Sequence, residues 1–321
     1  MASTRPFRFG VHTSDARTGD DWADAARRYE SLGFSTLMLR DHFDQQLAPI
    51  VAMTAAACAT ETLRVGCLVF ANDYRHPLVL AKELLTLDRL SGGRVEVGLG
   101  AGWMGSDYEQ AGLAFDAPRD RVSRLEEAVR VIKAFFSGES VDFSGDHYTV
   151  AAHEMYPPSV QKPGPPMLLV AGGPRMTRFA AAEADIVAIN PATKSNEAWA
   201  EQNLADAGAD AVDRKIAAIR GAAGSRYDDI ELQIVVPFVV PTDDREGTAR
   251  AIADSLPADD AAVDLSAETV LASPYVLIGT EDQICDTLVE RRERWDLSYY
   301  VFNDDSIDAV APIVARLNGR A

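Results

Sequence analysis

Several features that mark other protein classes are scarce in this chain of 321 residues. No window holds about 18 consecutive apolar residues, so we expect no transmembrane helix. The amino terminus has no basic region followed by an apolar stretch, so we expect no secretion signal and a cytoplasmic location. The chain has only three cysteines, Cys58, Cys67 and Cys285, without metal-ligand spacing. An odd number does not suit a disulfide framework, and we expect all three to be small buried side chains.

Positive charge is also scarce, because 31 Lys and Arg face 49 Asp and Glu, which gives a formal net charge of −18. Such a chain repels phosphate backbones and anionic lipid, so we expect neither nucleic acid nor membrane as its main partner. An anionic cofactor would need a local group of cationic side chains and backbone N–H groups. The five histidines include no pair spaced i, i+4, and we expect no metal site.

What the chain does have is an eightfold alternation of short apolar runs with amphipathic stretches. This rhythm predicts a single (β/α)8 TIM-barrel domain over residues 1–321. We expect strands at residues 7–12, 34–40, 63–70, 95–99, 167–171, 186–190, 231–236 and 298–303. Two segments depart from the repeat: residues 140–150 read as a β-hairpin, and residues 243–274 as an insertion with two short helices around the acidic pair Asp259-Asp260.

In such a barrel the loops after the strands build the active site. His42 directly follows the second strand, where a ring that titrates near neutrality could move a proton. The alternative is that Asp41 caps a helix beside a packed histidine. In the loop after the third strand, Arg75 either meets an acidic group or pairs with Asp73.

Two glycine motifs follow later strands. Residues 100–105 satisfy G-x-G-x-x-G, but we expect a loop after them and no immediate helix, which argues against a dinucleotide fingerprint. These glycines would let a flat ligand approach the backbone. The run from Gly172 through Gly173 and Pro174 to Arg175 lies between a strand and a helix and is the candidate phosphate loop, unless it is only a tight turn that needs glycine.

The order of these motifs resembles the bacterial luciferase-like flavin and deazaflavin oxidoreductases. The resemblance covers residues 63–66, 75–77, 80–83, 86–94 and 98–103, and continues through 121–136, 145–148, 157–166, 172–173 and 278–284. Only about 243–274 lies outside it. The pair Asp41-His42 and the Trp103 loop look more like the branch that uses coenzyme F420, a deazaflavin hydride carrier, than like the FMN monooxygenases.

The resemblance implies roles for particular residues. His42 would be the proton donor or base, and Asp41 would orient it. Leu68-Val69 matches the place where the family often has a non-prolyl cis peptide behind the ring. Phosphate would be held by Gly172, Gly173, Pro174 and Arg175, and the ring and substrate would be bordered by Asn72, Gly102 and Trp103.

These roles imply an F420-dependent oxidoreductase that transfers a hydride between deazaflavin C5 and a carbon of a small organic substrate, at a C=C, C=N or alcohol/carbonyl group. The resemblance also implies a homodimer. The sugar-phosphate dehydrogenases of the branch have a glutamate where Trp103 stands, which argues against a sugar-phosphate substrate. Trp103, Phe43, Tyr74 and Phe70 suggest an apolar wall, although such residues also serve in packing. Two alternatives remain: an FMN-dependent monooxygenase with a partner flavin reductase, and a non-catalytic barrel that binds a flavin-like ligand.

Overall fold

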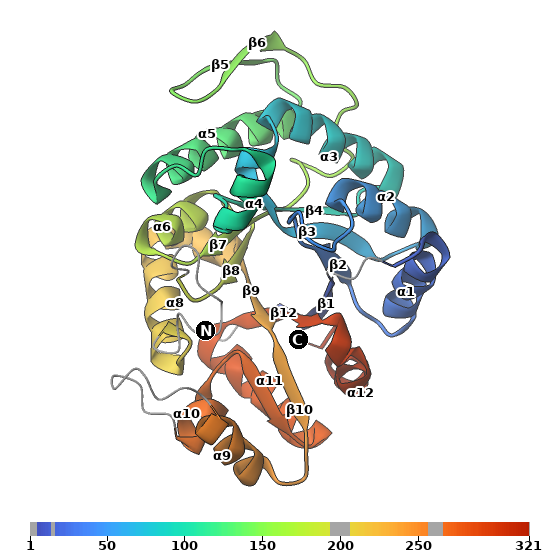
Figure 1. Cartoon of the computed structure of the whole chain (residues 1–321), viewed down its shortest axis with the longest axis vertical. Helices are drawn as coiled ribbons and strands as arrows, with labels where there is room; N and C mark the ends of the chain where they lie inside the picture. Colours follow the sequence, from blue (N-terminus) through green and yellow to red (C-terminus); the bar gives the residue numbers. More distant parts are fainter. Residues whose placement is uncertain (1–4, 14–16, 193–205, 256–265, 321) are drawn as a thin grey trace. The chain divides into compact units, whose positions relative to one another are not determined.

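The computed structural model describes residues 5–13, 17–192, 206–255 and 266–320. Eight parallel strands form a closed barrel in the order β1-β12-β9-β8-β7-β4-β3-β2 (Figure 1). They are β1 (Arg8–Thr13), β2 (Thr36–Leu39), β3 (Arg64–Ala71), β4 (Val95–Gly100), β7 (Met167–Ala171), β8 (Ile186–Ile189), β9 (Glu231–Val236) and β12 (Leu297–Asn303). The predicted TIM barrel is therefore confirmed, with each strand within two residues of its expected bounds.

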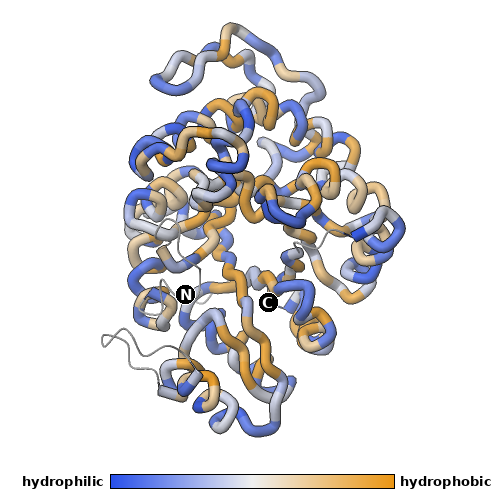
Figure 2. Tube along the Cα trace, in the orientation of Figure 1, coloured by the Kyte–Doolittle hydropathy of each residue, from blue (hydrophilic) through white to orange (hydrophobic). Residues whose placement is uncertain are grey.

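The barrel strands are apolar along most of their length, and they are orange where Figure 2 colours the chain by hydropathy. Val95, Val97 and Leu99 of β4 are completely buried. Strands buried on both faces are typical of parallel sheets covered by helices. By contact density the chain divides into an amino-terminal unit, His12–Ser31 with Ser35–Leu169, and a carboxy-terminal unit, Met1–Val11 with Leu32–Phe34 and Val170–Ala321.

The helices of the amino-terminal unit begin and end where proline and glycine predict. They are α1 (Gly19–Ser31), α2 (Pro49–Ala59), the 3-10 helix η1 (Asn72–Tyr74), α3 (Pro77–Ser91), α4 (Gly105–Ala111) and α5 (Pro118–Ser137). Proline starts α2, α3 and α5, where a missing N–H costs nothing. Gly92, Gly112 and Gly138 end α3, α4 and α5 in the left-handed conformation.

Two segments of this unit test the predictions for its loops. Strands β5 (Val141–Ser144) and β6 (Thr149–His153) pair antiparallel, which confirms the predicted hairpin (top of Figure 1). The prediction of a loop after the glycine motif of residues 100–105 is wrong, because the helix α4 begins at Gly105. Its buried residues Asp107 and Tyr108 hold this short helix, and neither their burial nor their partners can be read from local sequence.

The carboxy-terminal unit contains α6 (Pro174–Glu183), α8 (Ala209–Ala223), α11 (Glu281–Trp295), α12 (Ile307–Leu317) and the 3-10 helices η3 (Gly224–Asp229) and η4 (Asp304–Ser306). Its insertion has more structure than predicted. Two helices, α9 (Arg245–Ser255) and α10 (Ala267–Ala272), match the expected pair, while Asp259 and Asp260 lie outside the described residues. Two unexpected strands, β10 (Phe238–Pro241) and β11 (Val276–Gly279), pair in parallel beside them.

The insertion has an apolar core of its own. Ala249 and Ala253 of α9 pack with Val270 of α10 and Ile278 of β11, and all four are buried. Partly buried Val240 of β10 covers them. The segment is thus a small packed β-α-α-β layer and not a simple loop.

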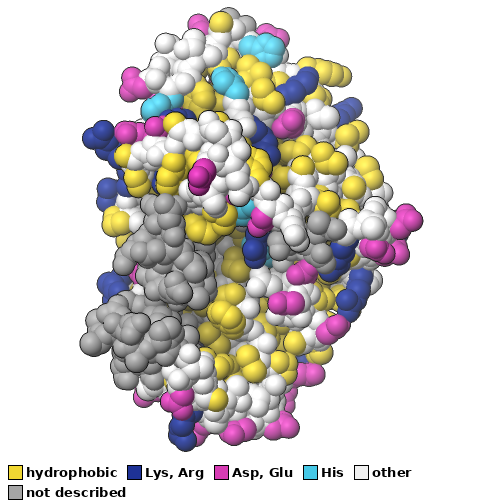
Figure 3. All heavy atoms as spheres, in the orientation of Figure 1, with side chains coloured by type: hydrophobic (Ala, Val, Ile, Leu, Met, Phe, Trp, Pro, Cys, Tyr) yellow, Lys and Arg dark blue, Asp and Glu magenta, His cyan; other side chains and the backbone are white. Residues whose placement is uncertain are grey.

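Charge and cysteine placement complete the fold. Acidic side chains gather over the part of the carboxy-terminal unit that holds α9 and β10 (Figure 3, lower edge), in keeping with the net charge of −18. Cys67 and Cys285 are buried as predicted, but Cys58 is exposed on α2, so the prediction for Cys58 is wrong. None of the helices among the described residues is long and apolar enough to span a membrane.

Candidate active site

The centre of the candidate site is a hydrogen-bonded pair of side chains that joins the end of β2 to α4. His42 Nδ1 lies 2.6 Å from Asp107 Oδ2, and Asp107 is only 3% exposed. The Tyr74 hydroxyl donates to the same oxygen at 2.9 Å. A carboxylate that accepts two hydrogen bonds favours a proton on His42 Nδ1. The other ring nitrogen, Nε2, has no hydrogen bond to any residue that the structure describes and can act as a base.

The neighbouring hydroxyl is held in its donor form. Burial raises the pKa of Tyr74 well above its ordinary value, and the hydrogen bond to Asp107 raises the pKa further. Tyr74 therefore stays protonated near neutrality and keeps donating to the carboxylate. The Asp107 side chain is fixed from two sides, by His42 and by Tyr74.

The Asp41 carboxylate has no hydrogen bond to His42 among the described contacts, so an orienting role for Asp41 would be indirect. Asp41 instead accepts two hydrogen bonds from Arg75, at 2.6 and 2.9 Å, and one from the backbone N–H of Ala71 at 2.9 Å. Burial alone would lower the pKa of Arg75, but the bidentate bond to Asp41 raises it. Two alternatives were open for Arg75, and the structure shows that it pairs with the acidic residue Asp41 and not with Asp73. The Asp41 pair ties the end of β2 to the end of β3 and so fixes the backbone at His42.

Asp73 takes part in a second network, which holds α4 and α5. It accepts a hydrogen bond from the Tyr108 hydroxyl at 2.9 Å and pairs with Arg124 at 2.9 Å. Burial raises the pKa of the Tyr108 hydroxyl, and the neighbouring Asp73 carboxylate raises it further. The hydroxyl therefore remains a hydrogen-bond donor. Because Tyr108 follows Asp107 on α4, this network also holds the carboxylate that His42 contacts. Sequence reasoning missed Asp107 and Tyr108, and the one local signal was Gly112, a helix-ending glycine seven residues after Gly105.

Aromatic rings and a glycine in the left-handed conformation follow at the same end of the barrel strands. Trp103 meets His42 edge to face, with ring centroids 5.8 Å apart and planes at 87°. Phe43 lies against Tyr74 with centroids 4.7 Å apart. Gly102 has φ of +75°, and a Cβ added there would lie 1.9 Å from the Tyr108 hydroxyl oxygen. Only glycine fits between α4 and the Trp103 loop.

The cis peptide that the resemblance implies is present between Leu68 and Val69. Both side chains are half-buried in a strand that is otherwise mostly buried. Val69 packs onto β4 where β4 has glycines: a Cβ at Gly98 or Gly100 would lie 3.0 or 2.6 Å from a Val69 methyl. The register of β3 with β4 shifts at this point.

Asn72 lies at the end of the same strand and is 2% exposed. Its side-chain amide donates to the Tyr148 hydroxyl at 3.0 Å. Because Nδ2 points toward Tyr148, the Asn72 amide oxygen remains as an acceptor. Tyr148, at the tip of the β5–β6 hairpin, is a further residue that the sequence analysis did not assign to the site.

The glycine loop of the carboxy-terminal unit has a different construction. Gly173 is the N-cap of α6, with no side-chain capping bond and no acidic residue in the first turn. A Cβ at Gly173 would meet nothing within 4 Å, and one at Gly172 would come no closer than 3.8 Å to any atom. The first N–H groups of a helix have no partner within the helix, so this open end suits an anion. Arg175 stands in the same first turn.

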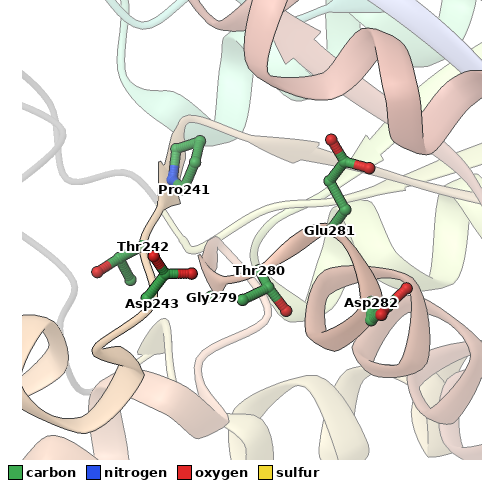
Figure 4. A pocket seen from close by; sticks show the side chains of 7 residues that line it. All are labelled: Pro241, Thr242, Asp243, Gly279, Thr280, Glu281 and Asp282. Carbon is green, nitrogen blue, oxygen red and sulfur yellow. The ribbon is translucent and has the colours of Figure 1, made fainter.

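The same unit contains a shallow depression of about 490 Å³ (Figure 4). It is lined by Pro241, Thr242 and Asp243 after β10 and by Gly279, Thr280, Glu281 and Asp282 at the start of α11. None of the candidate site residues lines it. Its three carboxylates disfavour an anion, and the backbone N–H groups at the start of α11 are engaged in a capping box of Thr280 with Gln283.

Comparison with known proteins identifies the family. The model of the luciferase-like monooxygenase family matches residues 1–296. The chain belongs to this family. It is 29% identical to an F420-dependent glucose-6-phosphate dehydrogenase of Mycolicibacterium smegmatis over 295 residues, which cover 85% of this chain and 84% of that protein. The same-named protein of Nakamurella multipartita is 32% identical over 191 residues, 56% of this chain and 55% of the relative.

Solved structures agree in fold. A coenzyme F420-dependent tetrahydromethanopterin reductase from Methanopyrus kandleri has a TM-score of 0.76 at 19% identity, covering 98% of this chain and 100% of its own. An F420-dependent secondary alcohol dehydrogenase has a TM-score of 0.75 at 18% identity, with the same coverage. A monooxygenase from Streptomyces bottropensis has 0.70 at 19% identity, covering 97% of both chains. At these identities the likeness concerns the fold alone.

Proposed function

We propose that this protein is an F420-dependent oxidoreductase that transfers a hydride between C5 of the deazaflavin and a carbon of a small organic substrate. The observation that carries the proposal is the His42–Asp107 pair at 2.6 Å, which leaves Nε2 ready to take or give a proton. The family of the chain and the F420 dependence named for its curated relatives support the cofactor. The reductase and dehydrogenase of the same fold are consistent with it.

Each unit by itself has residues that suit one part of this cofactor. The open, uncapped start of α6 gives Gly172, Gly173, Pro174 and Arg175 room for a phosphate. In the amino-terminal unit, half-buried Leu68 and Val69 would support one face of the ring, with Asn72, Gly102 and Trp103 at its edge. The Asn72 amide oxygen would accept from a ring N–H. When bound, F420 supplies a carbon that accepts or donates a hydride, and it does not activate dioxygen as a flavin does.

His42 carries the proton that accompanies the hydride. In substrate oxidation, neutral Nε2 takes the proton from a substrate hydroxyl as the carbon loses its hydride. In the reverse direction the imidazolium returns the proton to the substrate oxygen. Asp107 holds the ring orientation and stabilises the imidazolium, and Tyr74 holds Asp107. Asp41 has a supporting role here, through Arg75 and the backbone of Ala71.

The first experiment titrates the purified chain with oxidised F420 and with FMN side by side, followed by anaerobic turnover of the preferred cofactor. We expect F420 to bind tightly and FMN weakly. His42→Ala should lower turnover by about 10²- to 10⁴-fold, the range for losing a general acid or base, while F420 binding persists. His153→Ala, on the exposed β5–β6 hairpin, is the matched control. Binding of neither cofactor would contradict the proposal, and full activity of His42→Ala would contradict the role given to His42. Cofactor binding without any turnover would favour a non-catalytic barrel that binds a flavin-like ligand.

A second candidate is an FMN-dependent monooxygenase that works with a partner flavin reductase. The family description and the fold of the Streptomyces bottropensis monooxygenase favour it. Such an enzyme would bind FMN in preference and consume oxygen when supplied with reduced flavin. An oxygen electrode separates the two functions. For either function we propose a homodimer, which sedimentation velocity tests directly.

A further inference from the structure

Two aromatic side chains lie next to His42 in the amino-terminal unit, Phe43 and Trp103. Phe43, directly after His42, is 47% exposed. Trp103 is half-buried and meets the His42 ring edge to face at 5.8 Å. Single exposed apolar residues are common on protein surfaces, but apolar residues gathered around a proton-transfer group are typical of a ligand wall.

Tyr74 adds an apolar surface and not a polar one. Its hydroxyl is engaged with Asp107 at 2.9 Å, and its ring lies against Phe43 with centroids 4.7 Å apart. The hydroxyl is therefore not available to a substrate, whereas the ring pair is. A ligand that approaches His42 along this wall meets the faces and edges of rings.

The charges of the same loops disfavour an anion. Arg75 directs both terminal nitrogens at Asp41. Arg124 pairs with Asp73 and with Asp116. Asp44, two residues after His42, is exposed and adds a negative charge. A phosphate bound by Arg75 or Arg124 would have to displace a carboxylate from that arginine, which is costly.

We propose that the substrate is an uncharged, flat and largely apolar carbonyl compound, or the alcohol derived from it, and not a sugar phosphate. This inference rests on the proposed function. In the reducing direction the carbonyl carbon gains a hydride from reduced F420, and the carbonyl oxygen gains the proton from His42. In the oxidising direction the alcohol carbon gives its hydride to oxidised F420, and His42 takes the hydroxyl proton. Apolar contact with Phe43 and Trp103 supplies affinity, and such a substrate differs from the glucose 6-phosphate in the name of the relatives.

A matched pair of probes tests the charge requirement. Acetophenone and 4-acetylbenzoate share a flat aromatic ketone and differ by one carboxylate, and glucose 6-phosphate is the third probe. Binding of each to the full chain is measured by ligand-observed NMR, with and without F420. We expect acetophenone to bind about tenfold or more tightly than 4-acetylbenzoate, because Arg75 and Arg124 are already paired with carboxylates and the added charge would lose hydration at this wall. Glucose 6-phosphate should show no saturable binding and no turnover.

Variants then test the wall. Phe43→Ala should weaken acetophenone binding by about tenfold, the effect of losing one partly buried ring. Phe43→Leu keeps the apolar area and should lose less. Phe238→Ala removes a ring that is 50% exposed on β10 and should change nothing. Thermal unfolding of each variant checks that the fold persists.

Two results would overturn the inference. One is that 4-acetylbenzoate or glucose 6-phosphate binds as tightly as acetophenone. Half-buried Arg40, directly before Asp41, would then be the residue to test as the partner of the anion. The other is unchanged acetophenone binding in Phe43→Ala. F420 affinity, measured by fluorescence in the same samples, tests the proposed function separately. Absence of F420 binding would contradict the proposed cofactor, while the preference among the three probes would still decide the substrate class.

Discussion

The two units present their candidate residues in opposite ways. In the amino-terminal unit the polar candidate side chains are held by other side chains, as His42 is by Asp107 and Asp41 is by Arg75. In the carboxy-terminal unit the candidate phosphate loop has open space around Gly173 and offers backbone N–H groups at the start of α6. The geometry of the amino-terminal site depends on side chains brought together from distant positions in the sequence. The geometry of the candidate phosphate loop depends on glycines that leave the backbone N–H groups accessible. Substitutions should therefore act differently in the two regions.

The largest expected effect comes from breaking the partner of His42. Asp107→Asn should lower turnover by about 10²- to 10⁴-fold, because an amide neither fixes the Nδ1-protonated ring nor stabilises the imidazolium. The pH dependence of turnover should shift as well, which a purely structural role would not cause. Asp107→Glu, which restores the carboxylate, should recover part of the activity. Normal turnover in Asp107→Asn would make the pair incidental and return the orienting role to an unknown group.

The next effect is on stability and concerns the Asp41–Arg75 pair. Arg75→Met leaves a buried carboxylate uncompensated and should lower the free energy of unfolding by about 3–5 kcal/mol. Urea unfolding monitored by circular dichroism measures this loss. The double variant Asp41→Asn with Arg75→Met should lose less than the single Arg75→Met, because the stranded charge is gone. Equal losses in both would mean that the pair contributes through packing alone.

A comparison of glycines sharpens the contrast between the units. Gly102→Ala places a methyl in left-handed backbone against the Tyr108 hydroxyl and should cost about 1–3 kcal/mol of stability, with loss of activity. Gly173→Ala meets open space at a φ of −89° and should change stability by less than about 0.5 kcal/mol. Its effect should instead be weaker F420 binding. Equal destabilisation by both changes would contradict the distinction, and thermal unfolding with F420 titration decides it.

The same contrast explains how much the sequence could predict. The eight barrel strands and the hairpin follow from hydrophobic period and turn residues, which are local signals. Gly172 and Gly173 were visible for the same reason, since glycine between a strand and a helix marks a backbone site. Family resemblance placed the Leu68-Val69 cis bond correctly.

Partner choice was not predictable in this way. Asp41 is adjacent to His42 in sequence, but adjacent residues of an extended chain point to opposite sides, and Asp41 turns to Arg75. Asp107 reaches His42 from 65 positions away, through a seven-residue helix that lacks a strong local signal. Strands β10 and β11 were missed because they lie outside the barrel repeat and depend on pairing with each other. Contacts that depend on tertiary geometry leave little trace in local sequence.

The smallest expected effect concerns the hairpin that places Tyr148 on Asn72. The Glu127 carboxylate accepts from the backbone N–H groups of Asp146, His147 and Tyr148. Burial raises the pKa of Glu127, but the three donors lower it more, so its folded pKa lies below the ordinary value of 4.5. A lowered folded pKa means that the stabilisation is complete above about pH 4.5 and is lost as the pH falls through the folded value.

Glu127→Gln should therefore cost about 1 kcal/mol at pH 7 and progressively less below pH 4.5. Hydrogen exchange at the amides of Asp146, His147 and Tyr148 measures the loss where it occurs, and Glu126→Gln is the matched control on the same helix. A cost that stays constant down to acidic pH would mean that the carboxylate charge is not what holds the hairpin. The hairpin would then join the carboxy-terminal loop as a site held by backbone geometry, and the distinction between the two units would be one of degree.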